Sequence, residues 1–397
     1  IHMNVYADNA ATTRMSQAAV DAMLPFLRES YGNPSSLYTL GQKAAESLQA
    51  SRETMAKYLG CDAREITFTS GGSEADNQAL LTAATLGARK GKKHIISTAF
   101  EHHAILHSLK RLEKQGFEIP LLDVHENGLV TAQQVADAIR EDTCLVTVMY
   151  ANNEIGTIQP IAEIGAVCRE RGVLFHTDAV QAAGHLPINV REQNIDMLSL
   201  SAHKFHGPKG VGLLYARKGI FLTNLIEGGA QERGKRAGTE NVGGIAGMAA
   251  AFREACEHMD ENIAKVTALR DKLIDGLSKI PHCALNGDRE HRLPGNVNFC
   301  FEGIEGESML LLLDGKGICA SSGSACTSGS LDPSHVLLAI GRPHEVAHGS
   351  LRLTLCESNT EAEIDHILAC VPEIVAYLRG MSPIWRDLVE GKKSFIL

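Results

Sequence analysis

The stretch Cys144–Gln181 decides the fold, and it reads CLVTVMYANNEIGTIQPIAEIGAVCRERGVLFHTDAVQ. It holds two near-continuous apolar runs, at 144–150 and 173–178, on either side of an amphipathic pattern at 161–171 that predicts a helix. Parallel strands need such a crossover helix between them, and their two buried faces make them apolar throughout. The stretch therefore predicts one unit of a parallel sheet covered by helices.

The same alternation extends in both directions, from Glu65 to Tyr215. It predicts further strands at 65–70, 94–100, 197–202 and 210–216 and further helices at 73–89, 104–114 and 131–140. A single long helix is expected at 243–279, and beyond Pro281 two strand-like segments, 295–301 and 350–355, with two helices indicate a small α+β domain that the N-terminus joins. In α/β sheets of this kind, ligands bind beyond the carboxyl ends of the strands.

The bulk composition is that of an ordinary globular protein. The chain has 397 residues, of which 44% are hydrophobic, and a formal net charge of -9, which argues against a nucleic-acid partner. No apolar run reaches membrane-spanning length, so no membrane partner is expected. The ten cysteines contain no CxxC pair and no signal peptide is visible, so we expect a cytoplasmic protein whose thiols are mostly buried and not paired as disulfides.

Two residues at predicted strand ends indicate a cofactor. Lys204 follows the strand at 197–202, and a partly desolvated lysine can form a Schiff base. Asp178 ends the strand at 173–178, where a carboxylate could hold a cationic ring nitrogen. A lysine that only begins a loop and an aspartate that only caps a helix are the ordinary alternatives. Together, however, the pair is typical of pyridoxal phosphate (PLP) enzymes.

Three further strand ends carry polar residues that suit the same cofactor. The sequence TSGGSEADN at 69–77 places Gly72 and Ser73 at a helix start, where backbone N–H groups can bind phosphate. His102 could stack on a ring and move protons, and Asn153 could donate to an oxygen of the cofactor or substrate. Taken singly, each has a structural alternative: a serine at a helix start, a structural histidine or a turn asparagine.

In this order, these residues resemble the cysteine desulfurases of the NifS/IscS-like class. The resemblance covers nearly the whole chain, and the matching stretches are YADNAATT (6–13), YGNPSS (31–36), TSGGSEADN (69–77), EHHAI (101–105), NNEIGTIQPI (152–161), HTDAVQAAG (176–184), SAHKFHGPKG (201–210), GGAQERGKRAGTEN (228–241), SSGSACTSGSLDPS (321–334) and AHGSLRLTL (347–355). It implies the type I aminotransferase fold of PLP enzymes, with a mainly parallel large domain at 16–258 and a small α+β domain formed by 1–15 with 259–397.

The resemblance also implies a role for each site residue. Lys204 would form the Schiff base, Asp178 would face the pyridine nitrogen, and His102 would stack on the ring and help Lys204 move protons. Asn153 and Gln181 would hold the ring oxygen. Phosphate would be bound by Gly72, Ser73, Ser201 and His203, with Thr239 from the second subunit of a homodimer, and the substrate by Arg352, Asn153 and Asn33.

The loop from Cys319 to His335 carries the proposed nucleophile. By resemblance, Cys326 accepts the sulfur of L-cysteine as a persulfide, alanine is released, and the sulfur passes to a NifU- or IscU-like scaffold protein for iron–sulfur cluster assembly. A Gly/Ser-rich loop suits a thiol that must visit both places. No resident metal is expected, although a transient iron–sulfur cluster on Cys326 is conceivable by resemblance. Cys319 is expected to be a buried support.

The chain departs from the family pattern at several points. Cys356 and Glu357 replace a glycine–arginine pair that many members have, and Gly72 and Ser73 stand where alanine and threonine are common. The C-terminal stretch differs from that of IscS-like members, which favours the NifS-like branch. Three alternatives stay open: a selenocysteine lyase or another PLP enzyme, a catalytically idle scaffold-binding partner, and a metal site built from His102, His103, His203 and His206.

Overall fold

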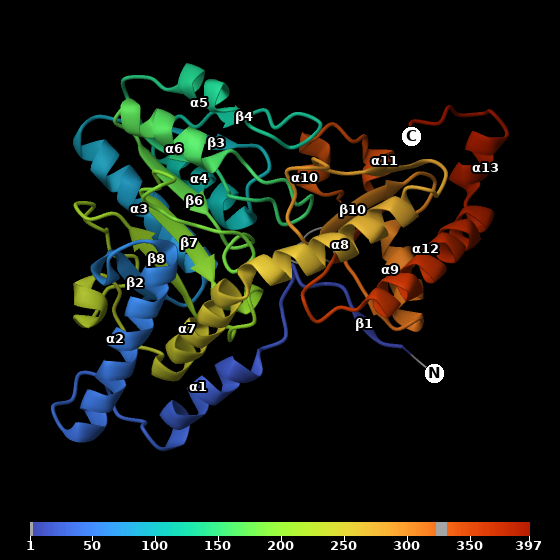
Figure 1. The fold of residues 1–397 in the computed structure, drawn as a ribbon. Coiled ribbons are helices and arrows are strands. Elements are labelled where there is room, and N and C mark those ends of the chain that lie inside the picture. The colour runs from blue at the N-terminus through green and yellow to red at the C-terminus, as the bar shows by residue number, and fades with distance from the viewer. Residues whose placement is uncertain (1–2, 323–331) are drawn as a thin grey trace.

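The computed structural model describes residues 3–322 and 332–397. Its central feature is a seven-stranded sheet with the strand order β2-β8-β7-β6-β5-β3-β4 (Figure 1). All neighbouring strands in it run parallel except β8, which is antiparallel to both β2 and β7. The strands are β2 (Ile66–Thr69), β3 (His94–Thr98), β4 (Leu121–Leu122), β5 (Thr143–Thr147), β6 (Leu174–Asp178), β7 (Met197–Ser201) and β8 (Gly212–Ala216). The predicted mainly parallel sheet is confirmed.

Both faces of this sheet are buried, as the apolar strands predict. Leu145 packs in the cluster under α3 and α4, whereas its neighbour Val146 packs on the opposite face with α2, α6 and α7. Met197 and Leu198 divide in the same way, because successive side chains of a strand point to opposite faces. The covering helices are α2 (Thr39–Leu59), α3 (Gly72–Arg89), α4 (His103–Lys114), α5 (Ala132–Ala138), α6 (Ile161–Glu170) and α7 (Val242–Glu257).

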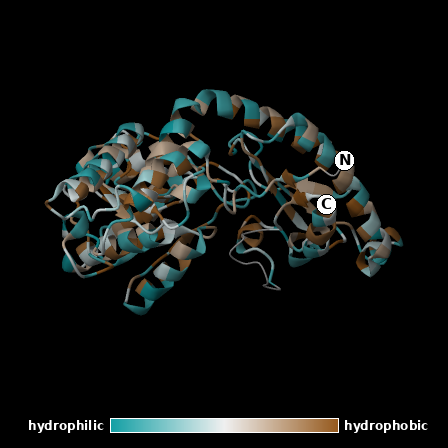
Figure 2. Cartoon of the chain, turned by 90° about the horizontal axis from the view of Figure 1, so that it is seen from below, coloured by the Kyte–Doolittle hydropathy of each residue, from teal (hydrophilic) through white to brown (hydrophobic). Residues whose placement is uncertain are grey.

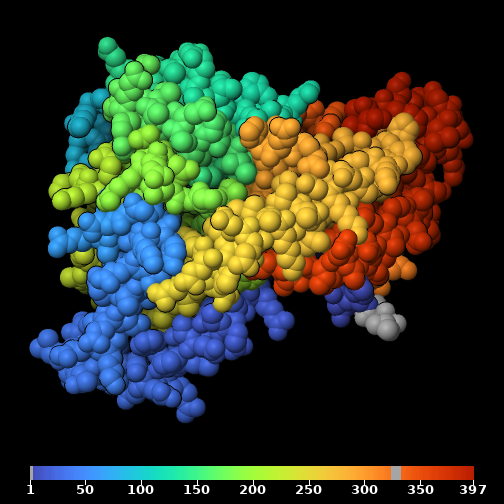
Figure 3. Space-filling view, in the orientation of Figure 1, coloured from blue at the N-terminus to red at the C-terminus, as the bar shows by residue number. Residues whose placement is uncertain are grey.

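The long helix expected at 243–279 is wrong as a single element. It is two helices, α7 (Val242–Glu257) and α8 (Met259–Leu277), which meet at His258. His258 ends the first helix and begins the second with φ -107° and ψ 15°, outside the helical region. The break lets α8 lie across to the smaller lobe, against α12 (Glu361–Met381) and β10 (Asn296–Phe301). The space-filling view shows this path in yellow (Figure 3).

The smaller lobe is built on a three-stranded antiparallel sheet, in the order β12-β10-β9. The N-terminal strand β1 pairs in parallel with β11 beside it. Figure 2 shows the two lobes spanned by a helical arch whose outer surface is mostly hydrophilic. The elements here are β1 (Val5–Tyr6), β9 (Cys283–Leu285), β10 (Asn296–Phe301), β11 (Ile318–Cys319) and β12 (Ser350–Thr354), with α9 (Gly306–Gly315), α10 (His335–Ala339), α11 (His344–Ala347), α12 (Glu361–Met381) and α13 (Pro383–Val389).

A second apolar cluster holds this lobe together. It joins residues of α8, α9 and α12 to the strands β10 and β12, so the predicted small α+β unit is confirmed. Cys319 does not belong to this cluster. It is exposed at the end of the two-residue strand β11, so the expectation of a buried support is wrong.

In residues 3–322 and 332–397, one helix and three 3-10 turns complete the fold. The helix α1 (Gln17–Arg28) packs on α7, and three 3-10 turns lie at Ala63–Glu65, Ala202–Lys204 and Gln231–Gly234. Within the described residues, no single helix has both the length and the apolarity to cross a membrane. The pair α12 and α13 has that length and apolarity only when the two are taken together, and they meet at an angle of 86°.

Candidate active site

The carboxyl ends of β5, β6 and β7 open into one cavity between the two lobes. Strand ends of a parallel sheet share an edge, so side chains that follow them converge. The cavity also receives the start of α3 and one arginine from β12. Of the predicted site residues, those that line it are Gly72, Ser73, His102, Asn153, Asp178, Gln181, Ser201, His203, Lys204 and Arg352.

Lys204 lies in the 3-10 turn that directly follows β7. Its Nζ donates hydrogen bonds to the backbone oxygens of Ala10 and Ala11, the latter at 2.9 Å. Gln181 Nε2 donates to the same Ala10 oxygen at 3.1 Å. The N-terminal segment at 7–13 therefore closes the cavity beside the lysine, although it is nearly 200 residues away in sequence.

Asp178, at the end of β6, shares the cavity floor with a second carboxyl group. Asp76 of α3 is fully buried, and burial together with the neighbouring charge and hydrogen bond of Asp178 raises the pKa of Asp76 well above its usual range. Burial also lowers the pKa of His176 to about 4, so this ring beneath the pair is neutral. Burial thus favours the protonated form of Asp76, while Asp178 is the carboxyl group of the pair that ends β6 and lines the cavity beside it.

Sequence reasoning missed Asp76. It stands within the quoted TSGGSEADN stretch but reads as an ordinary helix residue, because nothing local places it beside Asp178. A carboxylate on the buried face of a helix was the signal that could have found it, since the pattern puts Asp76 between the buried Ala75 and Ala79.

The start of α3 forms one wall of the cavity. Gly72 and Ser73 are its first helical residues, so their backbone N–H groups have no partner within the helix. A side chain at Gly72 would approach the Val180 side chain to 2.7 Å, so the wall is closely packed there. Ser201 and His203 face the same wall, and burial and then the charge of Lys204 lower the pKa of His203 to about 4. This wall offers hydrogen-bond donors and a helix start to an anion.

His102 is the N-cap of α4. Its Nδ1 accepts a hydrogen bond from the backbone N–H of Ala104 at 3.0 Å, so Nδ1 carries no proton. The preceding residue, Glu101, is fully buried, and burial raises its pKa to about 8. Thr98 Oγ1 donates to Glu101 at 2.5 Å, which fixes the turn that presents His102. His102 therefore enters the cavity with a defined ring orientation.

Arg352 closes the cavity from the side of the smaller lobe. The residue is only 1% exposed, and its guanidinium donates to the backbone oxygen of Asn153 at 2.9 Å and to Asp8 Oδ1 at 3.2 Å. Ser321 Oγ donates to the same Asp8 oxygen at 2.8 Å. Among the described residues, Arg352 Nε has no hydrogen-bond partner although it is buried. A free donor on a cation beside a cavity is suited to an anionic ligand.

Two predicted site residues within the described part of the chain do not line this cavity. Thr239 and Asn33 are exposed, and Asn33 Oδ1 accepts from Ser35 instead. Cys326, the predicted nucleophile, lies outside the described residues.

Cys356 and Glu357, which stand where many members of the resembled family have glycine and arginine, lie just behind the cavity. Glu357 Oε1 is 2.9 Å from His206 Nε2. Burial alone would raise the pKa of Glu357, but the hydrogen bond and charge of His206 lower it to about 2. The added negative charge is thus matched by a cationic imidazole rather than left facing Arg352. The four histidines considered as metal ligands do not gather: His206 meets Cys356 and Glu357 instead.

Known proteins resemble this chain over its full length. The model of the class-V aminotransferase family matches residues 5–367. A cysteine desulfurase IscS of Clostridium botulinum is 53% identical over 99% of this chain and 100% of its own, and one of Methanosarcina thermophila is 54% identical over 96% and 94%. The solved structure of a NifS-like protein, 40% identical, superposes with a TM-score of 0.89 over 95% of this chain and 100% of its own.

Proposed function

Because the chain belongs to the class-V aminotransferase family and is a PLP-dependent cysteine desulfurase, we propose that it takes sulfur from L-cysteine through Cys326 and passes it to a scaffold protein. The observation that carries the proposal is the convergence of a lysine, a carboxylate, a helix start and an unsatisfied arginine on one cavity. The relatives' names include IscS, and a solved neighbour is called NifS-like, so the names do not separate the two branches.

The cavity residues fit PLP by the chemistry of their donors and acceptors. The α3 start with Ser73, Ser201 and His203 suits a phosphate, and the carboxylate of Asp178 suits a pyridinium nitrogen. Lys204 supplies the amine that would hold the aldehyde. When bound, PLP acts as an electron sink that weakens the bonds around the substrate's α- and β-carbons.

Each side chain then has a task that its surroundings support. Asp76, whose protonated form burial favours, would donate to Asp178 and support it as the group that faces the ring nitrogen. Lys204 is placed to accept a proton from the substrate's α-carbon and return one. His102, with Nδ1 engaged by Ala104, presents its ring to the cavity and carries its proton on Nε2.

We propose Arg352 as the group that binds the substrate carboxylate. Its Nε is buried and has no hydrogen-bond partner in the described part of the chain, while the Asn153 oxygen and Asp8 fix the rest of the guanidinium. A planar fork fixed in this way orients a carboxylate and with it the thiol of L-cysteine. The assignment of Asn33 to substrate binding stays a prediction.

Cys326 would complete the reaction as the sulfur acceptor. Its thiolate attacks the substrate sulfur, the Cβ–S bond breaks, and the bonding pair stays on carbon, which gains a proton as alanine forms. The products are alanine and a persulfide on Cys326. We propose a NifU- or IscU-like scaffold for iron–sulfur assembly as the next acceptor. Cys326 must be kept as a free thiol, not a disulfide, to accept sulfur, which supports a cytoplasmic location.

A homodimer is proposed from the surface of the large lobe. The segment formed by α1, α2 and their connection projects from the body (Figure 3, blue), and it exposes large apolar side chains. Such a patch is typical of an interface between subunits. Thr239 is exposed and does not line its own cavity, which agrees with service in a partner's cavity. The apolar side chains are Leu24, Leu27, Tyr31, Leu37 and Tyr38.

The decisive experiment compares the wild type with Cys326→Ala. Purified proteins are examined for visible cofactor absorption, then given L-cysteine with a reductant, and alanine and sulfide are measured. We expect equal alanine and sulfide from the wild type, and from the variant a spectral change on cysteine addition without turnover. Full activity in the variant would show that another group carries the sulfur. A yellow wild type that releases no alanine would point to selenocysteine or another amino acid.

A further inference from the structure

Three side chains that can bind a metal meet behind the cofactor cavity. His206 follows Lys204 by two residues, whereas Cys356 and Glu357 lie two and three residues beyond Thr354, the last residue of β12. The imidazole nitrogen, the thiol sulfur and a carboxylate oxygen all lie within 4.8 Å of one another. No other such group of three histidine, cysteine, aspartate or glutamate residues occurs among the described residues.

The surroundings of His206 prepare it to be a ligand. Its Nδ1 lies 2.8 Å from the backbone oxygen of Arg14, and because a carbonyl only accepts, Nδ1 carries the proton. Its backbone N–H donates to Thr13 Oγ1 at 2.8 Å, and its φ of 69° is unusual for a residue other than glycine. Nε2 is thereby directed at Glu357. Metal-binding histidines are commonly oriented in this way, by a carbonyl that accepts from the other ring nitrogen.

The two residues after β12 are also held in place. The backbone N–H of Cys356 donates to Asn359 Oδ1 at 2.8 Å, and Asn359 Nδ2 in turn donates to the Tyr6 oxygen at 3.1 Å. Cys356 is 5% exposed, and its Sγ lies 2.9 Å from Ser358 Oγ. Its thiol is therefore kept from bulk solvent, and besides the cluster it contacts the Ser358 hydroxyl.

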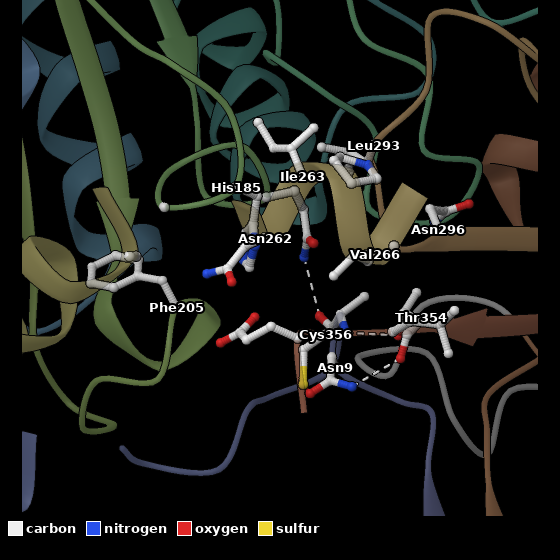
Figure 4. Close-up of a pocket in the computed structure, with 18 of the residues that line it drawn as sticks. Asn9, His185, Phe205, Asn262, Ile263, Val266, Leu293, Asn296, Thr354 and Cys356 are labelled. Carbon is white, nitrogen blue, oxygen red and sulfur yellow. Dashed lines mark hydrogen bonds between the residues drawn. The ribbon is translucent and has the colours of Figure 1, made fainter. Parts of the chain in front are cut away.

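A pocket borders the cluster and leaves room for one more ligand. Figure 4 shows Cys356 and Asn9 on one side of this pocket and Asn262 and Ile263 on the other. Cys356 and Glu357 both line it, as does His206. A site with three protein ligands and a fourth, open position is the usual arrangement of zinc where a water or small molecule completes the tetrahedron.

We propose that His206, Cys356 and Glu357 bind a divalent cation of the zinc class. A thiolate and a carboxylate would neutralise the two positive charges, and imidazole would be the neutral third ligand. This mixed nitrogen, sulfur and oxygen set suits Zn²⁺ rather than Mg²⁺ or Ca²⁺, which prefer oxygen alone. Binding displaces two protons, one from the Cys356 thiol and one from Nε2 of the His206 imidazolium.

The cation would connect the two halves of the active site. His206 belongs to the segment that holds Lys204, and Cys356 follows the strand that carries Arg352. A metal here would therefore fix the lysine segment against the arginine strand. The three ligands do not line the cofactor cavity, so their role is one of positioning and the metal is not a reactant.

The test measures metal binding directly in the full-length, PLP-loaded protein. Every protein carries Cys326→Ser, so that this thiol cannot supply a ligand. Zinc content after dialysis is measured by mass spectrometry, and Co²⁺ is titrated into the chelator-treated protein to record the visible bands of a tetrahedral thiolate site. Cys356→Ser and Glu357→Gln are compared with Cys370→Ser, a matched control whose thiol lies 3.8 Å from His366 Nε2 but belongs to no group of three possible ligands among the described residues.

We expect about one zinc per chain in the reference protein and in Cys370→Ser, and affinity lowered by about 10- to 100-fold or more in the two cluster variants. The Co²⁺ spectrum should lose its sulfur-to-metal band in Cys356→Ser. Glu357→Gln keeps the volume of the side chain, so it decides the matter if Cys356→Ser does not fold. Equal metal content in the reference protein and in Glu357→Gln, or a reference spectrum without the thiolate band, would overturn the proposal.

Discussion

Replacing Arg352 by lysine tests how the substrate is recognised. The guanidinium is buried, donates to the Asn153 oxygen at 2.9 Å and to Asp8 at 3.2 Å, and keeps its Nε without a partner among the described residues. Lysine keeps the positive charge but gathers its donors on one atom, so it cannot hold a carboxylate through two parallel hydrogen bonds. The variant therefore separates the geometry of the site from its charge.

The expected loss of catalytic efficiency and of stability follows from the hydrogen bonds that the variant cannot make. A hydrogen bond to a charged group contributes about 1.5–3 kcal/mol, so losing one lowers kcat/KM for L-cysteine by about 10- to 150-fold. The carboxylate is present in both the ground state and the transition state, so most of the loss should appear in KM. The Asn153 oxygen also loses its donor, and we expect the free energy of unfolding to fall by about 1–3 kcal/mol.

The assay must distinguish recognition from stability. Initial rates of alanine formation are measured with L-cysteine, and cofactor absorbance is titrated with L-alanine and with ethylamine, which lacks the carboxylate. We expect Arg352→Lys to weaken the binding of L-alanine and to leave that of ethylamine unchanged. Arg292→Lys is the matched control, since Arg292 is equally buried but outside the cavity. Equal weakening of both amines by Arg352→Lys, or an unchanged kcat/KM, would refute the reasoning.

Three further predictions concern the supporting residues. The pKa of Glu101 is about 8 in the folded protein and near 4.5 in the unfolded chain. Its contribution to the free energy of unfolding therefore falls as pH rises between these values, by at most about 1.4 kcal/mol per pH unit. Urea unfolding of Glu101→Gln at several pH values should lack this slope, and a slope identical to that of the wild type would contradict the assignment. Asp76→Asn can still donate to Asp178 and should keep the affinity for PLP within a few-fold of the wild type, whereas Asp76→Ala should lower it about 10-fold or more. Equal PLP dissociation constants for the two variants would disprove the hydrogen bond from Asp76 to Asp178. Gly212→Ala would place a Cβ 2.5 Å from the Leu200 oxygen and 2.8 Å from Gly71 Cα, so urea unfolding should show a loss of about 1–3 kcal/mol; an unchanged midpoint would show that the strand can shift freely.

The sequence predicts the large sheet well because its signal is local. Each strand from β5 to β7 lies in a stretch rich in apolar residues, and a polar residue such as Asp178 or Lys204 stands at its end or shortly after it. The edge of a parallel sheet then brings these ends together without further information. The reversal of β8 and the break at His258 carry no such signal. The stretch CEHMDEN has neither glycine nor proline, so the break follows from how α8 packs against the smaller lobe.

The supporting residues of the site were harder to predict because their roles depend on contacts between distant parts of the chain. Asp8 becomes a partner of Arg352 only because β1 returns to the smaller lobe, 344 residues away in sequence. Asp76 acquires its proton only because α3 packs over β6 beside Asp178. Residue type and spacing identify groups that touch a ligand, whereas the groups that tune them are chosen by tertiary contacts.

The cluster of His206, Cys356 and Glu357 shows where spacing rules stop. A search for metal ligands along the sequence compares residues a few positions apart, as on one helix or one turn. It therefore weighs His206 with His203 and leaves Cys356 aside as a departure from a family pattern. In the folded chain, the loop after Lys204 and the turn after β12 lie side by side, and the same three residues offer nitrogen, sulfur and oxygen within 4.8 Å. A departure from a pattern is thus better interpreted by what it contacts than by what it replaces, because a substitution that removes one interaction also supplies a new donor to its neighbours.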